Sequence, residues 1–302
     1  MASKNILITG GSGLLGRHLT DALLKQGHKV SHLSRQAGKN PDINTFLWDV
    51  DKRRIDPACI DGIDTIVHLA GAGIADKPWT AERKKEIVES RTESIRLIYA
   101  LMKQRSNDVK NIISASGINY YGDSGDKLLE EDDLPGNDFV ANCCIEWEKA
   151  VDEGTEFGLR IVKFRTGVVL TNEGGALPKL AQPVKMYVGS PLGGGKQWVP
   201  WIHPKDVTDM YLYALNTPQL AGTFNMVAPQ PVTNKQLTHA VAKQLGKPLW
   251  APNVPAFLIK LLFGEMAALV LGSTKGSAKK IQEHGFTFNY PDIESALREI
   301  YG

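Results

Sequence analysis

Short apolar segments alternate with longer amphipathic segments over the first three quarters of the chain. Apolar runs of about four to eight residues are typical of buried strands, whereas apolar residues at every third or fourth position are typical of helices. The pattern predicts strands at 6–9, 29–35, 45–49, 64–71, 109–116, 159–170 and 223–227, and helices that start at 14 and span 80–105 and 139–157. Because strands and helices alternate at this spacing, we predict an α/β fold with a parallel, doubly wound sheet.

The last third of the chain is less regular. From Gly174 the alternation loosens, and after 227 the pattern is mostly that of short helices. Thr233 is a predicted helix N-cap, since Gln236 three residues later completes a capping box. The acidic, turn-rich segment 123–138 is predicted to be a surface loop.

A glycine-rich turn joins the first predicted strand to the first predicted helix. Gly10, Gly13 and Gly16 stand at G-x-x-G-x-x-G spacing. Glycines let backbone amides approach a pyrophosphate, and the N-terminus of the helix adds a favourable dipole. The alternative is a βα turn that binds no ligand. We predict a dinucleotide site made by Thr9, Gly10, Gly13, Leu14, Leu15 and Gly16.

The end of the second predicted strand distinguishes the two nicotinamide cofactors. An acidic residue there binds the ribose 2′-hydroxyl of NAD, whereas an arginine accommodates the 2′-phosphate of NADP. This chain has Ser34 and Arg35 at that point and no acid, and Arg17 adds positive charge nearby. We therefore predict NADP(H) rather than NAD(H), the alternative being a solvated surface arginine.

Two further strand ends are predicted to contact the cofactor. Asp49, at the end of the third strand, either accepts from the adenine amino group or caps the following turn. Leu69, Ala70 and Gly71 end the fourth strand, and ligands gather at the carboxyl ends of parallel strands. Their small size is expected to leave room for the cofactor.

Composition excludes several classes of function. The chain has 302 residues, a formal net charge of +2 and no long basic block, which gives no electrostatic support for binding nucleic acid or an anionic membrane. No apolar run is long enough to span a bilayer, and the strand near the start leaves no room for a signal peptide. Three cysteines make no disulfide framework, so we expect a cytoplasmic protein. The seven histidines show no metal-ligand spacing, so we predict no metal site.

Several motifs together resemble the extended short-chain dehydrogenases/reductases, the NAD-dependent epimerase/dehydratase group. They are Thr9-Gly10-x-x-Gly13-x-x-Gly16, Leu69-Ala70-Gly71, the segment 114–122 and the segment 201–207. Trp79, Ser90-Arg91, Trp147-Glu148 and 263–266 resemble one atypical branch, called epimerase family proteins, which carries a C-terminal domain of unknown function. The resemblance implies a Rossmann domain at 1–170, to which 200–228 return. It also implies a smaller, mostly helical substrate domain made of 171–199 and 229–302.

The resemblance also implies a catalytic serine, tyrosine and lysine, the last two as Tyr-x-x-x-Lys. A tyrosine has a pKa of about 10 and needs a nearby cation to act near neutral pH. Ser116 fits the serine position, and Tyr121-Gly122 fits a Tyr-Gly pair that follows the same strand. Aligning Glu148 with the usual glutamate, however, puts Val140 and Cys144 at the tyrosine and lysine positions. The usual acid–base pair is therefore missing.

Other residues are candidates to replace that pair. The formal match Tyr99-x-x-x-Lys103 precedes the serine strand, so we interpret it as a packing tyrosine and a solvated lysine. Tyr120, Tyr121 and His203 are expected near the cleft, each with a structural role as its alternative. Cys144 would react only if positive charge lowered its pKa. We predict Ser116 and Tyr121 as catalytic, and Tyr120, Trp201 and His203 as substrate-binding.

Two functions follow from this pattern. One is an NADP(H)-dependent oxidoreductase or epimerase-like enzyme that acts on a small polar substrate such as a sugar derivative. The other is a non-catalytic NADP(H)-sensing protein, which the missing pair favours. Dimers are common in the superfamily, so a homodimer is an open expectation that no feature of the sequence supports.

Overall fold

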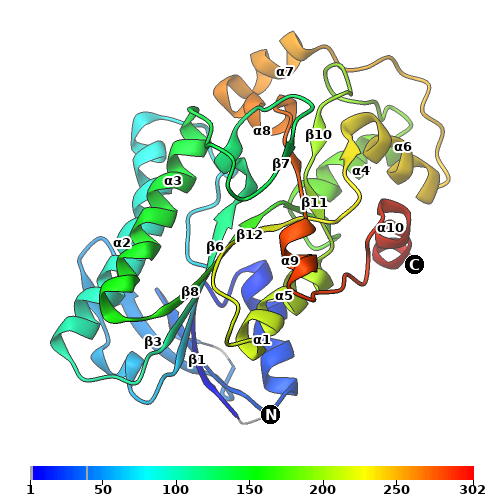
Figure 1. The fold of residues 1–302 in the computed structure, drawn as a ribbon. Helices are drawn as coiled ribbons and strands as arrows, with labels where there is room; N and C mark the ends of the chain where they lie inside the picture. The colour runs from blue at the N-terminus through cyan, green and yellow to red at the C-terminus, as the bar shows by residue number, and fades with distance from the viewer. Residues whose placement is uncertain (1–2, 39) are drawn as a thin grey trace.

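The computed structural model describes residues 3–38 and 40–302. Eight strands form its central sheet, in the order β12–β8–β6–β5–β1–β2–β3–β4 (Figure 1). Their bounds are β1 Asn5–Thr9, β2 Lys29–Ser34, β3 Asn44–Asp49, β4 Arg54–Ile55, β5 Thr65–His68, β6 Asn111–Gly117, β8 Arg160–Thr166 and β12 Gly222–Met226. All neighbouring strands are parallel except β3 and β4. The predicted parallel sheet is confirmed, and each predicted strand is present.

Helices cover both faces of this sheet (Figure 1). On one face lie α2 (Ala81–Gln104) and α3 (Phe139–Asp152), whose apolar residues form one buried cluster with Leu7 and Ile66. On the other face lie α1 (Leu14–Lys25) and α5 (Pro204–Asn216), which form a second cluster with Ile6 and Ile8. Alternate residues of β1 thus face opposite layers, as the pleat of a strand requires. Both faces are covered, which explains the continuous apolar runs in the sequence.

The C-terminal part packs around a third buried cluster. It contains α4 (Ala176–Lys185), α6 (Asn234–Gln244) and α10 (Ile293–Tyr301), together with Trp201 from the segment that returns to the sheet. Further helices are α7 (Ala256–Phe263), α8 (Ala268–Leu271) and α9 (Lys279–Glu283). The capping box of Thr233 and Gln236 is present, as predicted.

Short strand pairs and 3-10 helices connect these parts. The pairs are β7 (Leu128–Leu129) with β14 (Lys275–Gly276), β9 (Val168–Val169) with β11 (Trp201–Ile202), and β10 (Trp198–Val199) with β13 (Val232–Thr233). The 3-10 helices are η1 (Pro57–Ile60), η2 (Ile118–Tyr121), η3 (Glu153–Phe157) and η4 (Gly264–Ala267). Each is four or five residues long, too short for the hydrophobic period to reveal.

The acidic segment 123–138 differs from its predicted form. It contains β7, and both Leu129 and Glu131 are buried. The Glu131 carboxylate accepts a hydrogen bond from the backbone of Asn225 on β12, 2.7 Å away. The prediction of a plain surface loop was wrong here. Acidic residues suggest an exposed segment, but a carboxylate can be buried where a hydrogen-bond donor satisfies it.

Candidate functional site

The turn from β1 into α1 is a close backbone approach that only glycine permits. A Cβ at Gly16 would lie 2.4 Å from the carbonyl oxygen of Gly10, and Gly10 has a φ of +71°. A Cβ at Gly10 would lie 2.9 Å from the backbone of Leu69 at the end of β5. The glycines therefore bring β1, α1 and β5 together at one edge of the sheet.

The N-terminus of α1 leaves backbone donors unused. Gly13 is its N-cap residue and offers no side-chain cap. The amides of Leu14, Leu15 and Gly16 have no acceptor within the described part of the chain. Unpaired amides at a helix N-terminus, with the helix dipole behind them, form an anion-binding site suited to a pyrophosphate.

Thr9 lies beneath this site and does not face it. Its side chain is fully buried, and its hydroxyl accepts hydrogen bonds from the amides of Leu69 and Ala70, each 3.1 Å away. We predicted Thr9 as a cofactor contact. In the structure its side chain instead holds the loop after β5 against the end of β1.

The residues at the ends of β2 and β3 are open to solvent. Ser34 is half-buried and Arg35 is exposed, and no acceptor for the Arg35 guanidinium lies within the described residues. Asp49 already has partners: its Oδ1 accepts from the backbone of Lys52 at 3.0 Å, and its Oδ2 pairs with the Lys52 ammonium at 3.1 Å. These contacts favour the turn-capping role of Asp49 over the adenine contact.

The loops after β5 and β6 line the neighbouring part of the same edge. Gly71 is exposed, and the guanidinium of Arg91 on α2 lies directly against it. Gly117 ends β6, and a Cβ there would lie 3.0 Å from the sulfur of Cys144 on α3. Arg91 was not predicted as a site residue, although Ser90-Arg91 was among the motifs that resemble the atypical branch.

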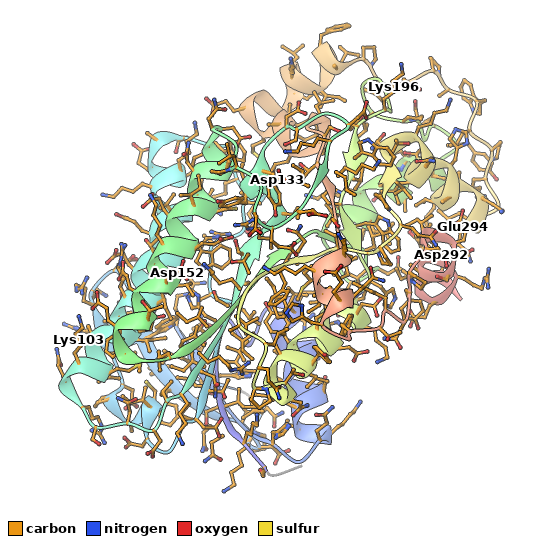
Figure 2. The ribbon with its side chains drawn as sticks, viewed as in Figure 1. Lys103, Asp133, Asp152, Lys196, Asp292 and Glu294 are labelled. Atoms are coloured by element: carbon orange, nitrogen blue, oxygen red, sulfur yellow. The ribbon has the colours of Figure 1, made fainter. Side chains whose placement is uncertain are left out.

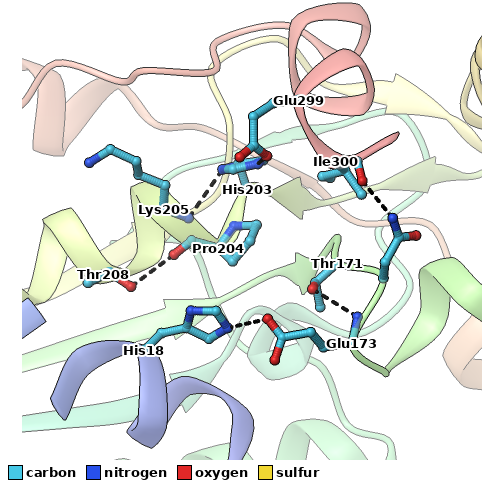
Figure 3. Close-up of a pocket in the computed structure, with 10 residues that line it drawn as sticks. His18, Thr171, Glu173, His203, Pro204, Lys205, Thr208, Glu299 and Ile300 are labelled. Atoms are coloured by element: carbon cyan, nitrogen blue, oxygen red, sulfur yellow. Dashed lines mark hydrogen bonds and ion pairs between the residues drawn. The ribbon is translucent and has the colours of Figure 1, made fainter. Parts of the chain in front are cut away.

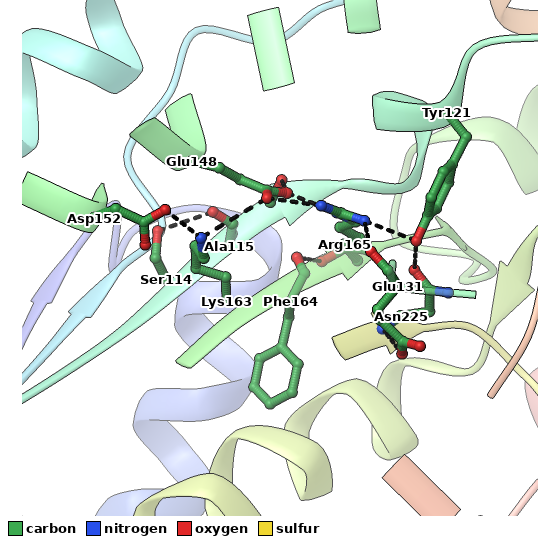
Figure 4. Close-up of polar contacts among 12 residues, drawn as sticks. Ser114, Ala115, Tyr121, Glu131, Glu148, Asp152, Lys163, Phe164, Arg165 and Asn225 are labelled. Carbon is green, nitrogen blue, oxygen red and sulfur yellow. Dashed lines mark hydrogen bonds and ion pairs between the residues drawn. The ribbon is translucent and has the colours of Figure 1, made fainter. Parts of the chain in front are cut away.

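Ser116 takes part in a buried ionic network, of which Figure 4 shows Glu148, Arg165 and Tyr121. Its hydroxyl donates to Oε1 of Glu148 at 2.7 Å, and it is only 4% exposed. The same carboxylate receives two hydrogen bonds from Arg165 on β8, at 2.8 and 3.0 Å. The hydroxyl hydrogen of Ser116 is committed to a buried carboxylate and the side chain is sealed from solvent, so the predicted catalytic role finds no support in this geometry.

Tyr121 belongs to the same network. Its hydroxyl donates to Oδ1 of Asn225 and accepts from Arg165, both at 2.8 Å. Burial raises the pKa of Tyr121 to about 12, although Arg165 acts in the opposite direction. Tyr120 is more exposed, and its ring stacks on the Arg165 guanidinium, 3.4 Å from the ring centre. Of the two tyrosines, only Tyr120 offers accessible surface to a ligand.

Arg165, Glu131 and Asn225 were missed as members of this network. They come from β8, the 123–138 connection and β12, and the Arg165 guanidinium also donates to the Glu131 carbonyl at 2.9 Å. No spacing in the sequence joins them. The only available signal was the presence of charged residues inside otherwise apolar strands.

Trp201 and His203 lie in the interior, away from the glycine turn. Trp201 is 1% exposed and donates through Nε1 to the Gln230 carbonyl, which leaves it no surface for a substrate. His203 is the N-cap of α5 and bonds Glu299 through Nε2 at 2.7 Å. Burial lowers the pKa of His203, against the opposing effect of Glu299. These positions do not support the predicted substrate contacts.

His203 borders a small polar cavity of about 290 Å³ between α1, α5 and α10 (Figure 3). His18 and Glu173 lie on its other side, with His18 Nε2 2.8 Å from the glutamate. None of the residues predicted to bind the dinucleotide lines it. We therefore separate this cavity from the candidate site.

The formal Tyr99-x-x-x-Lys103 pair has the structural roles that we expected. Tyr99 is 3% exposed, and its hydroxyl donates to the Val151 carbonyl at 2.8 Å. Lys103 is exposed at the surface, at the opposite end of the molecule from Lys196 of the C-terminal part (Figure 2). Neither residue reaches the carboxyl edge of the sheet.

All three cysteines are expected to react slowly in the folded protein. Cys59, Cys143 and Cys144 are free and buried, and burial raises the pKa of Cys144 to about 12. The thiolate is the reactive form, so a raised pKa suppresses reaction at neutral pH. With Ellman's reagent at pH 8 we expect no rapid release of chromophore until guanidinium is added, when three thiols should react. A thiol that reacts within seconds in the native protein would contradict this expectation.

Neither a membrane span nor a metal cluster is found in the described residues. No helix within 3–38 and 40–302 is long and apolar enough to cross a membrane. The same residues hold no group of three or more histidine, cysteine or acidic side chains arranged to bind a metal ion.

Comparison with known proteins gives consistent matches along the chain. The model of the NAD dependent epimerase/dehydratase family matches residues 6–227, and that of a domain of unknown function (DUF1731) matches residues 254–300. The epimerase family protein YfhF of Bacillus subtilis is 36% identical over 98% of this chain and 97% of its own length.

Solved structures agree with this match. The human epimerase family protein SDR39U1, solved with NADPH, has 29% identity and a TM-score of 0.87, and the alignment covers 98% of this chain and 99% of that one. A nucleoside-diphosphate sugar epimerase of Corynebacterium glutamicum has 32% identity and a TM-score of 0.80, covering 99% of this chain and 58% of that one.

Proposed function

This chain belongs to the NAD-dependent epimerase/dehydratase family, and from that premise we propose that it binds NADP(H) along the Gly10–Gly16 turn. The observation that carries the proposal is the glycine turn with its unpaired amides at the start of α1. A pyrophosphate held there would be neutralised by backbone donors and by the helix dipole. When bound, the cofactor supplies hydride chemistry, and the protein supplies its position and surroundings.

Arg35 is the basis for preferring NADP(H) over NAD(H). The exposed guanidinium follows β2, where the 2′-substituent of the adenosine ribose lies in this kind of fold. The NADPH in the structure of the similar human protein supports the same choice. Isothermal titration of NADPH and NADH into the purified protein tests it directly.

Arg35→Ala is expected to weaken NADPH binding by about tenfold or more and to leave NADH binding nearly unchanged. The reason is that charge-assisted hydrogen bonds to the 2′-phosphate, worth about 1.5–3 kcal/mol, exist only with NADPH. Arg298→Ala, which removes an exposed arginine from α10, serves as the control and should alter neither affinity. Equal losses for both cofactors in Arg35→Ala would contradict the assignment.

We further propose that the chain is an atypical oxidoreductase or epimerase-like enzyme that acts on a small polar substrate in the cytoplasm. The supporting observation is that Gly71, just after β5, is exposed and Tyr120, just after β6, is half-buried, both at the proposed nicotinamide end. Ketones, aldehydes and nucleotide sugars are to be screened with NADPH. Absorbance at the nicotinamide band detects net oxidation, and chromatography of the sugars detects epimerisation, which leaves the cofactor unchanged.

A non-catalytic NADP(H) sensor is the second candidate. It is favoured by the buried hydroxyls of Ser116 and Tyr121, each hydrogen-bonded within the protein, and by Cys144 in place of a lysine. The sensor predicts tight NADPH binding with no turnover in either assay, and a partner whose binding depends on NADPH. Turnover in either assay would instead establish the enzyme, and a loss of turnover of about a hundredfold in Tyr121→Phe, with stability retained, would give Tyr121 a role in positioning the site.

A further inference from the structure

Arg91 is a half-buried arginine for which the described residues provide no carboxylate partner. Among the described residues, its only hydrogen bond runs from Nη1 to the carbonyl of Ile87, one turn earlier on its own helix, at 2.7 Å. Other arginines that are at least partly buried have charged or multiple partners, although Nε of Arg83 is itself without one. Arg83, Arg96 and Arg165 pair with carboxylates, and Arg160 donates to four oxygen atoms.

The remaining donors of Arg91 are not completely sealed from solvent. The residue is half-buried, and neither Nε nor Nη2 is among the side-chain atoms that are both fully sealed and unpaired. One side of the guanidinium is supported by the Trp147 ring of α3, whose centre lies 5.1 Å from Cζ. The position of the charge is therefore set by packing and by the bond to Ile87, while two nitrogens stay available.

Gly71 keeps this guanidinium uncovered. A Cβ at Gly71 would stand 3.0 Å from Cζ and 3.2 Å from Nε of Arg91. Gly71 lies just beyond the carboxyl end of β5, on the edge of the sheet that carries the glycine turn. A side chain there would cover the donors, whereas glycine leaves them facing the edge where ligands bind in open parallel sheets.

The strand order indicates which end of a bound dinucleotide would lie near Arg91. Along the sheet, β6 and β5 lie on one side of β1, and β2 lies on the other. Under the proposed function, adenosine lies at β2 by Arg35 and the pyrophosphate lies at α1. The nicotinamide half then extends toward β5 and β6, which is where Arg91 stands.

We propose that Arg91 binds an oxyanion, a carboxylate or phosphate group, at the β5–β6 end of the cleft. This inference rests on the proposed function for the direction of the cofactor. A planar guanidinium with two free N–H donors suits the two oxygens of a carboxylate or phosphate. At this end the oxyanion belongs either to the substrate, which would then be an acidic small molecule, or to the cofactor's own phosphates.

Burial adds to the need for such a partner. It lowers the pKa of Arg91 from its usual value, and the neighbouring Arg83 acts in the same direction. The guanidinium stays charged at neutral pH even so. An oxyanion brought to it would restore the electrostatic stabilisation that the charge loses when it leaves water.

The first arm of the test measures NADPH affinity by titration calorimetry in the wild type, Arg91→Gln and Arg96→Gln. Arg96 is the matched control, since it lies on the same helix and is half-buried but already paired with Glu153. A loss of about tenfold to a hundredfold in Arg91→Gln alone assigns the oxyanion to the cofactor. Unchanged NADPH affinity leaves the substrate as its source, which the second arm examines.

The second arm adds inorganic phosphate, and separately acetate, to protein saturated with NADPH, so that the phosphate sites of the cofactor are already filled. We expect these anions to raise the melting temperature of the wild type and of Arg96→Gln, but not that of Arg91→Gln. Arg91→Lys keeps the charge and should retain part of the effect, which separates a lost anion site from a damaged fold. If Arg91→Gln changes neither NADPH affinity nor the response to the anions, the proposal is overturned.

The two proposals can fail separately. If the wild type does not bind NADPH, the proposed function fails. The anion titration is then made on the protein alone, with phosphate and acetate as before. A response that is lost in Arg91→Gln and kept in Arg96→Gln still supports the oxyanion site, and an equal response in all three overturns it.

Discussion

Glu148→Ala is expected to lower the free energy of unfolding by about 3–5 kcal/mol, which is a large part of the stability of an ordinary domain. Glu148 and Arg165 are 6% and 4% exposed, and two hydrogen bonds join them. Removing the carboxylate would leave the guanidinium charged and unpaired in the interior. The hydroxyl of Ser116 would lose its acceptor at the same time.

Urea denaturation followed by circular dichroism measures this change. Glu146→Ala is the matched control, because Glu146 lies on the same helix but is exposed and forms a surface ion pair with Lys149. That variant should unfold almost as the wild type does. The double variant Glu148→Leu, Arg165→Met should regain much of the lost stability, since an apolar pair can replace a buried ion pair. A small effect of Glu148→Ala would mean that water reaches the network.

Gly16→Ala is expected to weaken NADPH binding by about a hundredfold. The new methyl group would lie 2.4 Å from the Gly10 carbonyl oxygen and 2.6 Å from the Gly11 Cα, both backbone atoms that cannot rotate away. The turn must therefore move. Displaced amides lose charge-assisted bonds to the pyrophosphate at about 1.5–3 kcal/mol each, and two such losses account for the expected factor.

Gly27→Ala provides the control for that experiment. Gly27 ends the same helix with a φ of +79°, but no atom lies within 4 Å of the position of a new Cβ. The substitution should lower stability by about 1–2 kcal/mol through backbone strain and leave NADPH affinity unchanged. Titration calorimetry on both variants, with thermal unfolding as the stability measurement, separates a binding defect from general destabilisation. Equal affinity in Gly16→Ala and the wild type would place the cofactor elsewhere.

The central sheet was predictable because its signals are local. A strand such as β1 contains the continuous apolar run Ile6-Leu7-Ile8, and runs of this kind are typical of a parallel sheet covered on both faces. The turn after β1 was predictable from the glycine spacing for the same reason, because the backbone atoms that exclude a side chain at Gly16 belong to the same short segment. The two-residue strands, such as β4 and β7, leave no period to detect.

The environment of the predicted catalytic residues was not predictable in this way. Ser116 looked free because its partner Glu148 lies 32 positions later, and Tyr121 bonds Asn225 from 104 positions away. Trp201 and His203 were predicted to contact a substrate, yet tertiary packing buries both. Motif spacing locates residues along the chain, whereas hydrogen-bond partners depend on which strands become neighbours.

The position of β12 at the edge of the sheet has a consequence for how the protein is made. Its partner β8 ends at Thr166, but β12 begins only at Gly222, so more than fifty residues must be translated between them. Until then, one side of β8 has unpaired backbone groups, the kind of open edge on which chains aggregate. Asn225 also arrives with this strand, and with it the acceptor for Tyr121. During translation the glycine turn after β1 is therefore made early, whereas the sheet is completed only when β12 has been made.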